Sequence, residues 1–506
     1  MNTEKNNHVR MNKNRLVEVL GKPQKEFTRD DIIDFIGREG IEMVNFMYAA
    51  GDGRLKTLNF VINDCGYLAT ILSQGERVDG SSLFSYIDPA NSDLYVVPRY
   101  STAFVDPFAE IPTLVMLCSF FDKDGKPLPT SPEYTLRKAC DAFEAATGAR
   151  FEAMGELEYY VIGPAPEEFP TVDQRGYHES GPFAKFNGLR TRCMLDIARA
   201  GCMVKYGHSE VGNFTAGGML YEQNEIEFLP VEALDSADQL MIAKWIIRNH
   251  VARTEGCDVT FAPKITVGKA GSGLHIHMRL MRDGENIMLD ADHRLSDAAR
   301  KAIAGMMTMA ESITAFGNAI PTSYFRLVPH QEAPTSICWG DRNRSVLVRV
   351  PLGWTGETDM CSQVNPLEAG TPVNAHGKQT VEIRSADCSA DIYLLLAALA
   401  VACRHGFEMP DALEVAKETY VDIDIHRCAD AERLKNIRTL PQCCAESAAA
   451  LEHDRAIYEQ GGVFSPRLID GIIAALKAFD DAQLVCDARS DAELMRAVVD
   501  KYFYCG

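Results

Sequence analysis

The stretch GELEYYVI at residues 155–162 decides how this chain folds. Side chains of a β-strand alternate between its two faces, so Glu156 and Glu158 point the same way, about 7 Å apart. The two tyrosines, the valine and the isoleucine that follow are typical of a buried strand. Because carboxylates on a buried strand need a compensating cation, the stretch predicts a sheet that carries a cation site.

Further strand-like runs follow this stretch and alternate with helical segments. Strands are expected at 152–162, 224–229, 258–262, 274–280, 345–350 and 379–385. A helix is expected at 236–254, and the chain from residue 389 onward reads as largely helical. The apolar run 392–403 is too short to cross a bilayer and is typical of a core helix. The chain therefore reads as an α+β protein.

The N-terminal side of the stretch reads as a small domain dominated by strands. Thr28 and Asp31 have the spacing of a capping box at the start of a short helix. A hairpin turn is expected around Gly51, between strands at 41–48 and 55–62.

A second helix start marks the boundary between two domains. Ser131 and Pro132 are expected as its N-cap and first residue, and Gly148 lies past its end. A chain of 506 residues is too long for one ordinary core, so at least two domains are expected. We assign them to residues 1–130 and 131–506.

Composition and charge exclude several classes of protein. The chain has 51 Lys and Arg against 71 Asp and Glu, a formal charge of −20, which argues against a nucleic-acid or anionic-membrane binder. The first 15 residues are polar and carry no apolar signal region, so a cytoplasmic protein is expected. The 15 cysteines lack a repeated C-x-x-C spacing and are expected as free, mostly buried thiols.

Acidic side chains recur inside other apolar, strand-like segments. Glu210 lies in one such segment and Glu225 in the next. For their neighbours Glu222 and Glu227 we favour the simpler interpretation, an exposed acid at the edge of a strand.

A glycine-rich turn leads into two histidines. The motif GSGLHIH at 271–277 puts His275 and His277 on one strand face, and glycine at 271 permits close approach of the backbone to a ligand. Glu382 and Arg384 also share a strand face. Five carboxylates and one imidazole in all form a mostly hard-oxygen set, which suits Mg²⁺ or Mn²⁺ better than Zn²⁺.

Arginines are concentrated in one segment of this acidic chain. Arg326, Arg342, Arg344 and Arg349 follow one another there, and the last two alternate with Val and Leu as in a strand. Planar guanidinium groups suit carboxylate and phosphate oxygens. Together with the acidic set, they predict a phosphoryl-transfer site that works by positioning and charge stabilisation.

Taken in order, these segments resemble the glutamine synthetase family, in particular its bacterial-type members. The resemblance runs from about residue 15 nearly to the C-terminus and rests on VDGSS at 78–82, GELEYY at 155–160, GSGLHIH at 271–277, YFRLVPHQEAP at 324–334, RNRS at 342–345 and EIRSAD at 382–387. It implies an N-terminal β-grasp domain and a catalytic domain with an antiparallel sheet and surrounding helices. It also implies a homo-oligomer of stacked hexameric rings, with active sites between neighbouring subunits.

The resemblance also implies a role for each matching residue. One metal ion would be held by Glu158, Glu210 and Glu225, and a second by Glu156, His275 and Glu382. The substrate site would include Gly271, Arg326, Arg384, Tyr177 and Ser82. ATP would meet His277, Arg344 and Arg349. The catalytic residues would be Arg344, Asp79, which takes a proton from ammonium in a neighbour's site, and Glu332, a flap residue that closes over the intermediate.

The activity implied joins ammonia to the γ-carboxylate of L-glutamate through a γ-glutamyl phosphate made with ATP. Two alternatives stay open: a glutamate–amine ligase that forms γ-glutamyl amides, and a catalytically silent, ring-forming relative. The glutamate–amine ligase is supported by Ala270, where the family usually has Asn, and by residues 211–224, which we expect to be an inserted loop. Ammonia is favoured by a small, negative pocket made of Asp79, Ser82, Tyr177 and Glu210.

Overall fold

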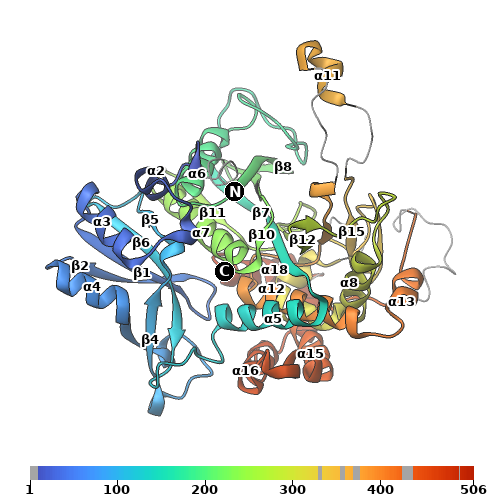
Figure 1. Ribbon diagram of the computed structural model, residues 1–506. Helices are drawn as coiled ribbons and strands as arrows, with labels where there is room; N and C mark the ends of the chain where they lie inside the picture. The colour runs from blue at the N-terminus through green and yellow to red at the C-terminus, as the bar shows by residue number, and fades with distance from the viewer. Residues whose placement is uncertain (1–8, 329–332, 354–358, 369–375, 424–436, 489) are drawn as a thin grey trace.

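The structure, a computed structural model, describes residues 9–328, 333–353, 359–368, 376–423, 437–488 and 490–506 (Figure 1). A smaller N-terminal part built on one sheet lies beside a larger part built on a second sheet. Both parts combine helices with largely antiparallel strands, so the α+β class expected from the sequence is confirmed.

The N-terminal sheet has the strand order β2-β1-β6-β4-β3, with β5 paired to β6. Its strands are β1 (Met43–Ala49), β2 (Leu55–Val61), β3 (Glu76–Asp79), β4 (Asp93–Pro98), β5 (Phe104–Val105) and β6 (Thr113–Phe121). Strands β1 and β2 form the expected antiparallel hairpin, while β1 and β6 run parallel. The helices packed with this sheet are α2 (Arg15–Leu20), α3 (Arg29–Glu39) and α4 (Cys65–Gln74).

The capping box at the start of α3 is confirmed. Thr28 Oγ1 accepts a hydrogen bond from the Asp31 N–H, and the Asp31 carboxylate accepts one from the Thr28 N–H. This reciprocal pair satisfies two backbone donors that a helix N-terminus leaves unpaired.

The large sheet has the order β14-β15-β16-β12-β7-β9-β8, antiparallel except between β14 and β15. These strands are β7 (Arg150–Pro164), β8 (Val204–Ala216), β9 (Met219–Phe228), β12 (Leu274–Arg282), β14 (Trp339–Asp341), β15 (Val348–Val350) and β16 (Val381–Ile383). The short strands β10 (Val231–Glu232) and β11 (Asp258–Thr260) pair with β7, and β13 (Glu285–Asn286) pairs with β12. The expected strands all occur, although β15 and β16 are shorter than expected.

Helices surround this sheet and make up most of the C-terminal region. They are α5 (Pro132–Thr147), α6 (Asn187–Arg199), α7 (Ala233–Ala252), α8 (Asp297–Thr308), α9 (Ala310–Gly317), α10 (Ser323–Arg326), α11 (Met360–Val364), α12 (Ile392–Glu408), α13 (Ala412–Glu418), α15 (Cys444–Glu459), α16 (Pro466–Lys477), α17 (Ala482–Ala488) and α18 (Ala492–Tyr502). Helix α5 begins at Pro132 and ends before Gly148, as expected. The domain boundary between residues 130 and 131 stays a prediction.

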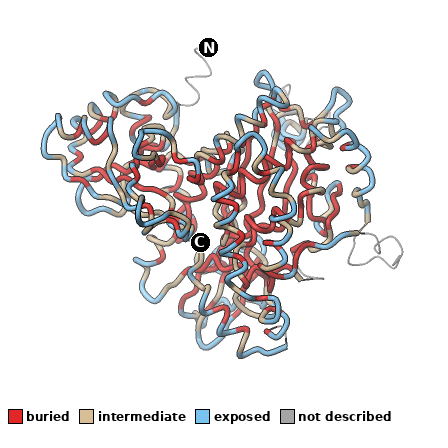
Figure 2. Tube along the Cα trace, turned by 90° about the horizontal axis from the view of Figure 1, so that it is seen from below, coloured by how far each residue is buried: buried red, intermediate tan, exposed pale blue. Residues whose placement is uncertain are grey.

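Helix α12 is the centre of the hydrophobic core, as its apolar sequence predicts. It packs against α5, α7, α8, α9 and α15, and buried chain dominates the middle of the larger part (Figure 2). Within the described residues, no single helix has the length and hydropathy to span a membrane; α12 and α13 meet that test only as a pair bent by 111°. The 14 described cysteines are free, and most are buried, as expected.

Residues 211–224 do not form the loop expected from the sequence. They are the paired arms of a β-hairpin, in which β8 and β9 are joined by Gly217 and Gly218, both with positive φ. Glycine adopts such angles without steric cost. The register shifts between Ser209 and Asn213, so the residues between them bulge from the ladder. The prediction was wrong because strand pairing depends on a partner segment that local composition does not reveal.

A buried ion pair joins the two parts of the molecule. Arg99, which follows β4, donates to both carboxylate oxygens of Asp238 on α7, at 2.5 and 2.7 Å. Tyr393 on α12 donates to the same carboxylate at 2.7 Å. The side chains of Arg99 and Asp238 are only 14% and 7% exposed. Removing one partner therefore leaves a charge buried without compensation.

We expect Asp238→Ala to lower the free energy of unfolding by about 3–5 kcal/mol, because the Arg99 charge stays buried. The matched control is Asp34→Ala, which breaks an exposed pair with Arg38 inside α3 and should cost less than about 1 kcal/mol. Urea unfolding of both variants measures the difference. Equal losses would contradict the role given to the buried pair.

Candidate active site

One face of the large sheet gathers the acidic and imidazole side chains selected from the sequence. Residues opposite each other on neighbouring strands have adjacent side chains, so strand pairing determines which groups meet. The opposed pairs are Glu156 with His275, Glu158 with Glu225, Glu382 with His277, and Glu382 with Arg349. Segments far apart in the chain thus contribute to a single site.

Glu156, His275 and Glu382 form the first of three groups whose ligand atoms lie within 4.8 Å of one another. His275 Nδ1 lies 2.8 Å from Glu156 Oε2 and 3.6 Å from Glu382 Oε1. The buried Glu382 carboxylate also accepts from Arg349 at 2.9 Å and from Arg384 at 2.5 Å. Burial acts to raise the pKa of Glu382, but the positive charges of Arg384, His277 and His275 together outweigh it and the net shift is downward. The structure thus brings together the residues expected around one metal ion.

The second group joins Glu210 and Glu225 to His208, which the sequence analysis did not select. His208 Nε2 lies 3.4 Å from Glu225 Oε1. Burial raises the pKa of Glu210 to about 7, and the charge of Glu158 adds to this shift. Burial and the charge of Glu156 likewise raise the pKa of Glu225. This group therefore concentrates negative charge that the surrounding side chains do not fully offset.

Glu158 approaches the second group from β7. Its Oε2 accepts from the Gly273 N–H at 2.7 Å and from Gln223 Nε2 at 3.1 Å. These donors hold the carboxylate in place beside Glu210. Its role as a ligand in this group stays a prediction.

The expectation of exposed strand-edge acids at positions 222 and 227 is wrong. Both residues are 2% exposed, because β9 is an interior strand between β7 and β8. Glu222 accepts from the backbone N–H groups of Lys185 and Phe186 at 2.8 and 3.1 Å. It therefore anchors the segment before α6 and lies apart from the cation groups.

Glu227 belongs to a third group, with Glu156 and His277. His277 Nε2 lies 2.9 Å from Glu156 Oε1, and its Nδ1 lies 2.9 Å from Thr380 Oγ1. Glu227 Oε1 pairs with Lys205 Nζ at 2.6 Å, whereas Oε2 is buried without a hydrogen-bond partner in the described chain. Sequence reasoning missed this group. The available signal was the two-residue spacing from Glu225, which places both carboxylates on one strand face.

Four arginines lie around these acidic groups. Arg326 is 4% exposed and donates to backbone carbonyls in the segment 384–386. Arg349 and Arg384 are tied to the Glu382 carboxylate, and their Nε atoms are buried without a partner among the described residues. Arg344 is exposed and lies on a turn before β15, outside the strand expected for it.

These groups line one cavity of about 1080 Å³. The sequence-selected residues that line it are Glu156, Glu158, Tyr177, Glu210, Glu225, Gly271, His275, His277, Arg326, Arg344, Arg349 and Arg384. A Cβ atom on Gly273 would collide with the Arg326 guanidinium and the His275 ring, so the turn needs glycine at this position.

Three residues predicted for the active site are not among those that line this cavity. Asp79 ends β3 in the N-terminal part, and its carboxylate accepts from the hydroxyls of Ser81 and Ser82 at 2.7 Å each. The Ser82 hydroxyl contributes most to holding the pKa of Asp79 well below its usual range. Neither Asp79 nor Ser82 lines the cavity of its own chain. Glu332, the expected flap residue, lies outside the described residues.

Comparison with known proteins assigns the chain to a family. The family model of the glutamine synthetase catalytic domain matches residues 129–496, and that of the glutamine synthetase β-grasp domain matches residues 40–123. The chain belongs to the glutamine synthetase family. It is therefore a ligase, as expected, and the expected β-grasp and catalytic domains are confirmed.

Individual relatives of the glutamine synthetase family match over most of their length. A glutamine synthetase of Streptomyces coelicolor is 31% identical over 491 residues, which cover 90% of this chain and 96% of the relative. One of Thermus thermophilus is 30% identical over 400 residues, or 76% and 81% of the two chains.

Solved structures share the fold at lower identity. A Plasmodium falciparum glutamine synthetase has a TM-score of 0.72 at 20% identity, covering 90% of this chain and 96% of the other. GmaS without ligand has a TM-score of 0.70 at 20% identity, covering 91% and 96%.

The side chains of this glutamine synthetase family member fit divalent cations. Glu382 and Glu227 have arginine or lysine partners, but Glu225 faces only carboxylates and His208 among the described residues. Burial and, after it, repulsion by these carboxylates raise the pKa of Glu225. A set of carboxylates with few imidazoles and no thiolate suits Mg²⁺ or Mn²⁺.

We expect Glu225→Gln to change thermal stability with opposite signs in two buffers. With a chelator present, the variant should unfold about 2 °C higher than wild type, because one repelling charge is removed. With excess Mn²⁺, it should lose most of the stabilisation that the ion gives wild type.

Glu222→Gln is the matched control for this test. It weakens an acceptor of two backbone N–H groups and should unfold at a lower temperature in both buffers. If Glu225→Gln behaved like this control, the assignment of Glu225 to a cation site would be wrong.

Proposed function

We propose that this chain catalyses ATP-dependent ligation of ammonia to the γ-carboxylate of L-glutamate, giving glutamine, ADP and phosphate. The observation that supports this most directly is the cavity of about 1080 Å³, in which acidic groups on the sheet face several arginines. Phosphoryl transfer between two anions depends on positioned positive charge on the protein or on bound cations. The cavity offers arginines and, next to them, acidic groups that could hold cations.

Divalent cations, Mg²⁺ or Mn²⁺ and two or more per site, fit the acidic face. Their proposed ligands are Glu156, His275 and Glu382 on one side, and Glu158, Glu210 and Glu225 on the other. When bound, such ions would offset negative charge on the phosphoryl oxygens.

The arginines are proposed to position the two anionic substrates. Arg326, beneath the turn at Gly271, would hold the glutamate carboxylate, and Arg384 the glutamyl group. Arg344 and Arg349, with His277, would meet the phosphates of ATP. A γ-carboxylate oxygen then attacks the terminal phosphorus, and the bond from that phosphorus to the ADP oxygen breaks.

Ammonia is proposed to complete the reaction at the end of the cavity lined by Tyr177 and Glu210. Its nitrogen attacks the γ-carbon, the bond to the phosphate oxygen breaks, and phosphate leaves with the proton that the nitrogen gives up. Ammonium must first lose a proton, for which we propose Asp79 of a neighbouring subunit, held charged by Ser82. This requires a homo-oligomer, which we propose to be the stacked rings implied by the family resemblance.

Mixing inactive subunits tests whether active sites are shared. Asp79→Ala keeps an intact cavity, and Glu156→Gln keeps an intact Asp79, so each variant alone should be inactive. Co-assembled at equal amounts, they should recover about a quarter of wild-type activity, because one interface in four joins the two intact halves. The control mixes Asp79→Ala with a chain that carries both substitutions and should recover nothing. Equal activity in both mixtures would exclude shared sites.

A glutamate–amine ligase remains the second candidate, and a specific arrangement favours it. Tyr177 is 50% exposed and stacks on His178 at 4.1 Å between ring centroids, and His178 lies 4.3 Å from His208. Aromatic faces beside Glu210 would also attract an alkylammonium ion. Ala270, whose N–H donates to Gln174 Oε1, leaves no side-chain polar group at the glutamate entrance.

A panel of amines decides between the two candidates. With glutamate and ATP, phosphate release should have a kcat/KM for ammonium about tenfold or more above that for methylamine, because a pocket shaped for one group discriminates against an added methyl. Ethylamine and putrescine should react more slowly still, and reactions without glutamate are the control. Faster turnover with any of these amines than with ammonium would replace the leading proposal with the second.

A further inference from the structure

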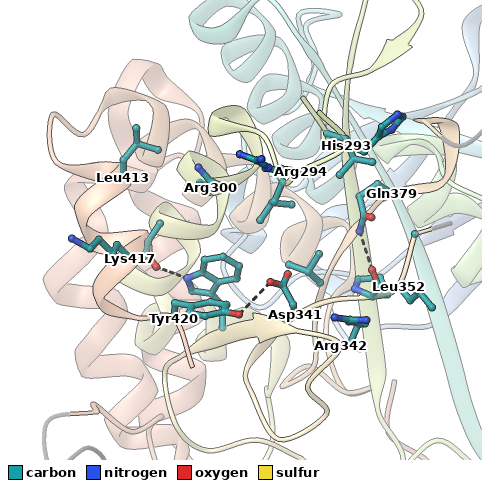
Figure 3. A pocket seen from close by; sticks show the side chains of 17 residues that line it. His293, Arg294, Arg300, Asp341, Arg342, Leu352, Gln379, Leu413, Lys417 and Tyr420 are labelled. Atoms are coloured by element: carbon teal, nitrogen blue, oxygen red, sulfur yellow. Dashed lines mark hydrogen bonds between the residues drawn. The ribbon is translucent and has the colours of Figure 1, made fainter. Parts of the chain in front are cut away.

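Figure 3 shows a second cavity, of about 650 Å³, which shares part of its lining with the active-site cavity. It is bounded by the segment 289–300, by residues of β14 and β15 and the segment 351–353, and by α13. Among the described residues, only Arg342, Pro351 and Leu352 line both cavities. No residue with a role in the proposed ligation lines the second one, so it is a separate site.

The inner wall of this second cavity is an aromatic pair. Trp339 Nε1 donates to the Ala416 carbonyl at 2.5 Å, and the Trp339 and Tyr420 rings are T-shaped with centroids 4.8 Å apart. Trp339 is 6% exposed, whereas Tyr420 is 36% exposed. Apolar surface is added by Leu289, Leu295, Val350 and Leu413. A cavity of this size with aromatic and aliphatic walls suits a flat ring of a small molecule.

Basic side chains surround the aromatic pair. The lining includes His293, Arg294, Arg300, Arg342 and Lys417, against the single acid Asp341. In the view of Figure 3, Tyr420 and Asp341 lie between Lys417 and Arg342. The Asp341 carboxylate accepts from the Tyr420 hydroxyl at 3.3 Å.

Most of this positive charge is not neutralised by the protein. Among the described residues, Arg294, Arg342 and Lys417 form no ion pair, and Arg300 has one partially exposed partner at 3.3 Å. Such a concentration of positive charge is unexpected in a chain of formal charge −20. It creates a local potential that attracts anions. Guanidinium groups in particular match the oxygens of a phosphate group.

We propose that this second cavity binds a small organic anion that combines a flat aromatic or heteroaromatic ring with a phosphate monoester. The ring would pack against Tyr420 and the aliphatic wall, and the phosphate would lie among Arg294, Arg342 and Lys417. A doubly charged headgroup fits three cationic side chains better than a single carboxylate does. The site shares Arg342 with the wall of the active-site cavity but none of the residues given a role in the proposed ligation, and it does not depend on the amine that the enzyme uses.

Phenyl phosphate is the simplest probe of this class, and calorimetric titration measures its binding. The full chain is first saturated with Mg²⁺ and ADP, so that the probe cannot occupy the nucleotide site. Phenyl phosphate should still bind, and the double variant Arg294→Gln/Lys417→Gln should bind it about tenfold more weakly or worse, since charge-assisted hydrogen bonds are lost. Both substituted side chains are exposed, so the fold should be unchanged.

The matched control is Arg282→Gln, an exposed arginine that donates to the Thr147 carbonyl and does not line the cavity. It should bind phenyl phosphate as wild type does. Inorganic phosphate and benzyl alcohol, each with half of the proposed ligand, should bind about tenfold more weakly than phenyl phosphate. The proposal is overturned if ADP abolishes binding, if the double variant matches wild type, or if inorganic phosphate binds equally well.

Discussion

Repulsion among buried carboxylates is the constraint on which the rest of the large domain depends. Glu156, Glu158, Glu210 and Glu225 are held near one another, and burial together with this repulsion raises the pKa of the last two. Isolated charges removed from water cost several kcal/mol each. An arrangement of this kind persists only where a rigid frame holds it and other parts of the fold offset its cost.

The strand β7 carries two of the repelling carboxylates on one face and the apolar contacts that offset their free-energy cost on the other. Its alternate residues point to opposite faces, so Glu156 and Glu158 face the cavity while Gly155 and Leu157 face the helices. Leu240 of α7 packs so closely that a Cβ atom on Gly155 would collide with it. The apolar face of the same strand is thus sealed against a helix whose buried side chains supply hydrophobic stabilisation. One strand therefore joins the hydrophobic core to the acidic site.

Local patterns predict this strand but not the groups around it. The two-residue spacing at Glu156 and the capping box at Thr28 depend only on neighbours in sequence, and the structure has both. The burial of Glu227 depends on β8 covering β9, and the pairing of Lys205 with it depends on the same register. These are contacts between segments, which composition and periodicity do not contain. For the same reason, nothing near Trp339 in the sequence indicates a second cavity, because its walls come from separate segments.

In the proposed function, the ion pair between Arg99 and Asp238 also helps to position the catalytic residue Asp79. Arg99 follows β4, and β4 pairs with β3 up to Asp79. Fixing Arg99 to Asp238 therefore helps to fix the position of β3 and of Asp79, which does not line the cavity of its own chain. If the two parts could move relative to each other, the Asp79 carboxylate would occupy many positions. Catalysis is sensitive to misplacements of about 1 Å. The buried pair thus helps to hold the two parts in a fixed arrangement, as the proposed site shared between subunits would require.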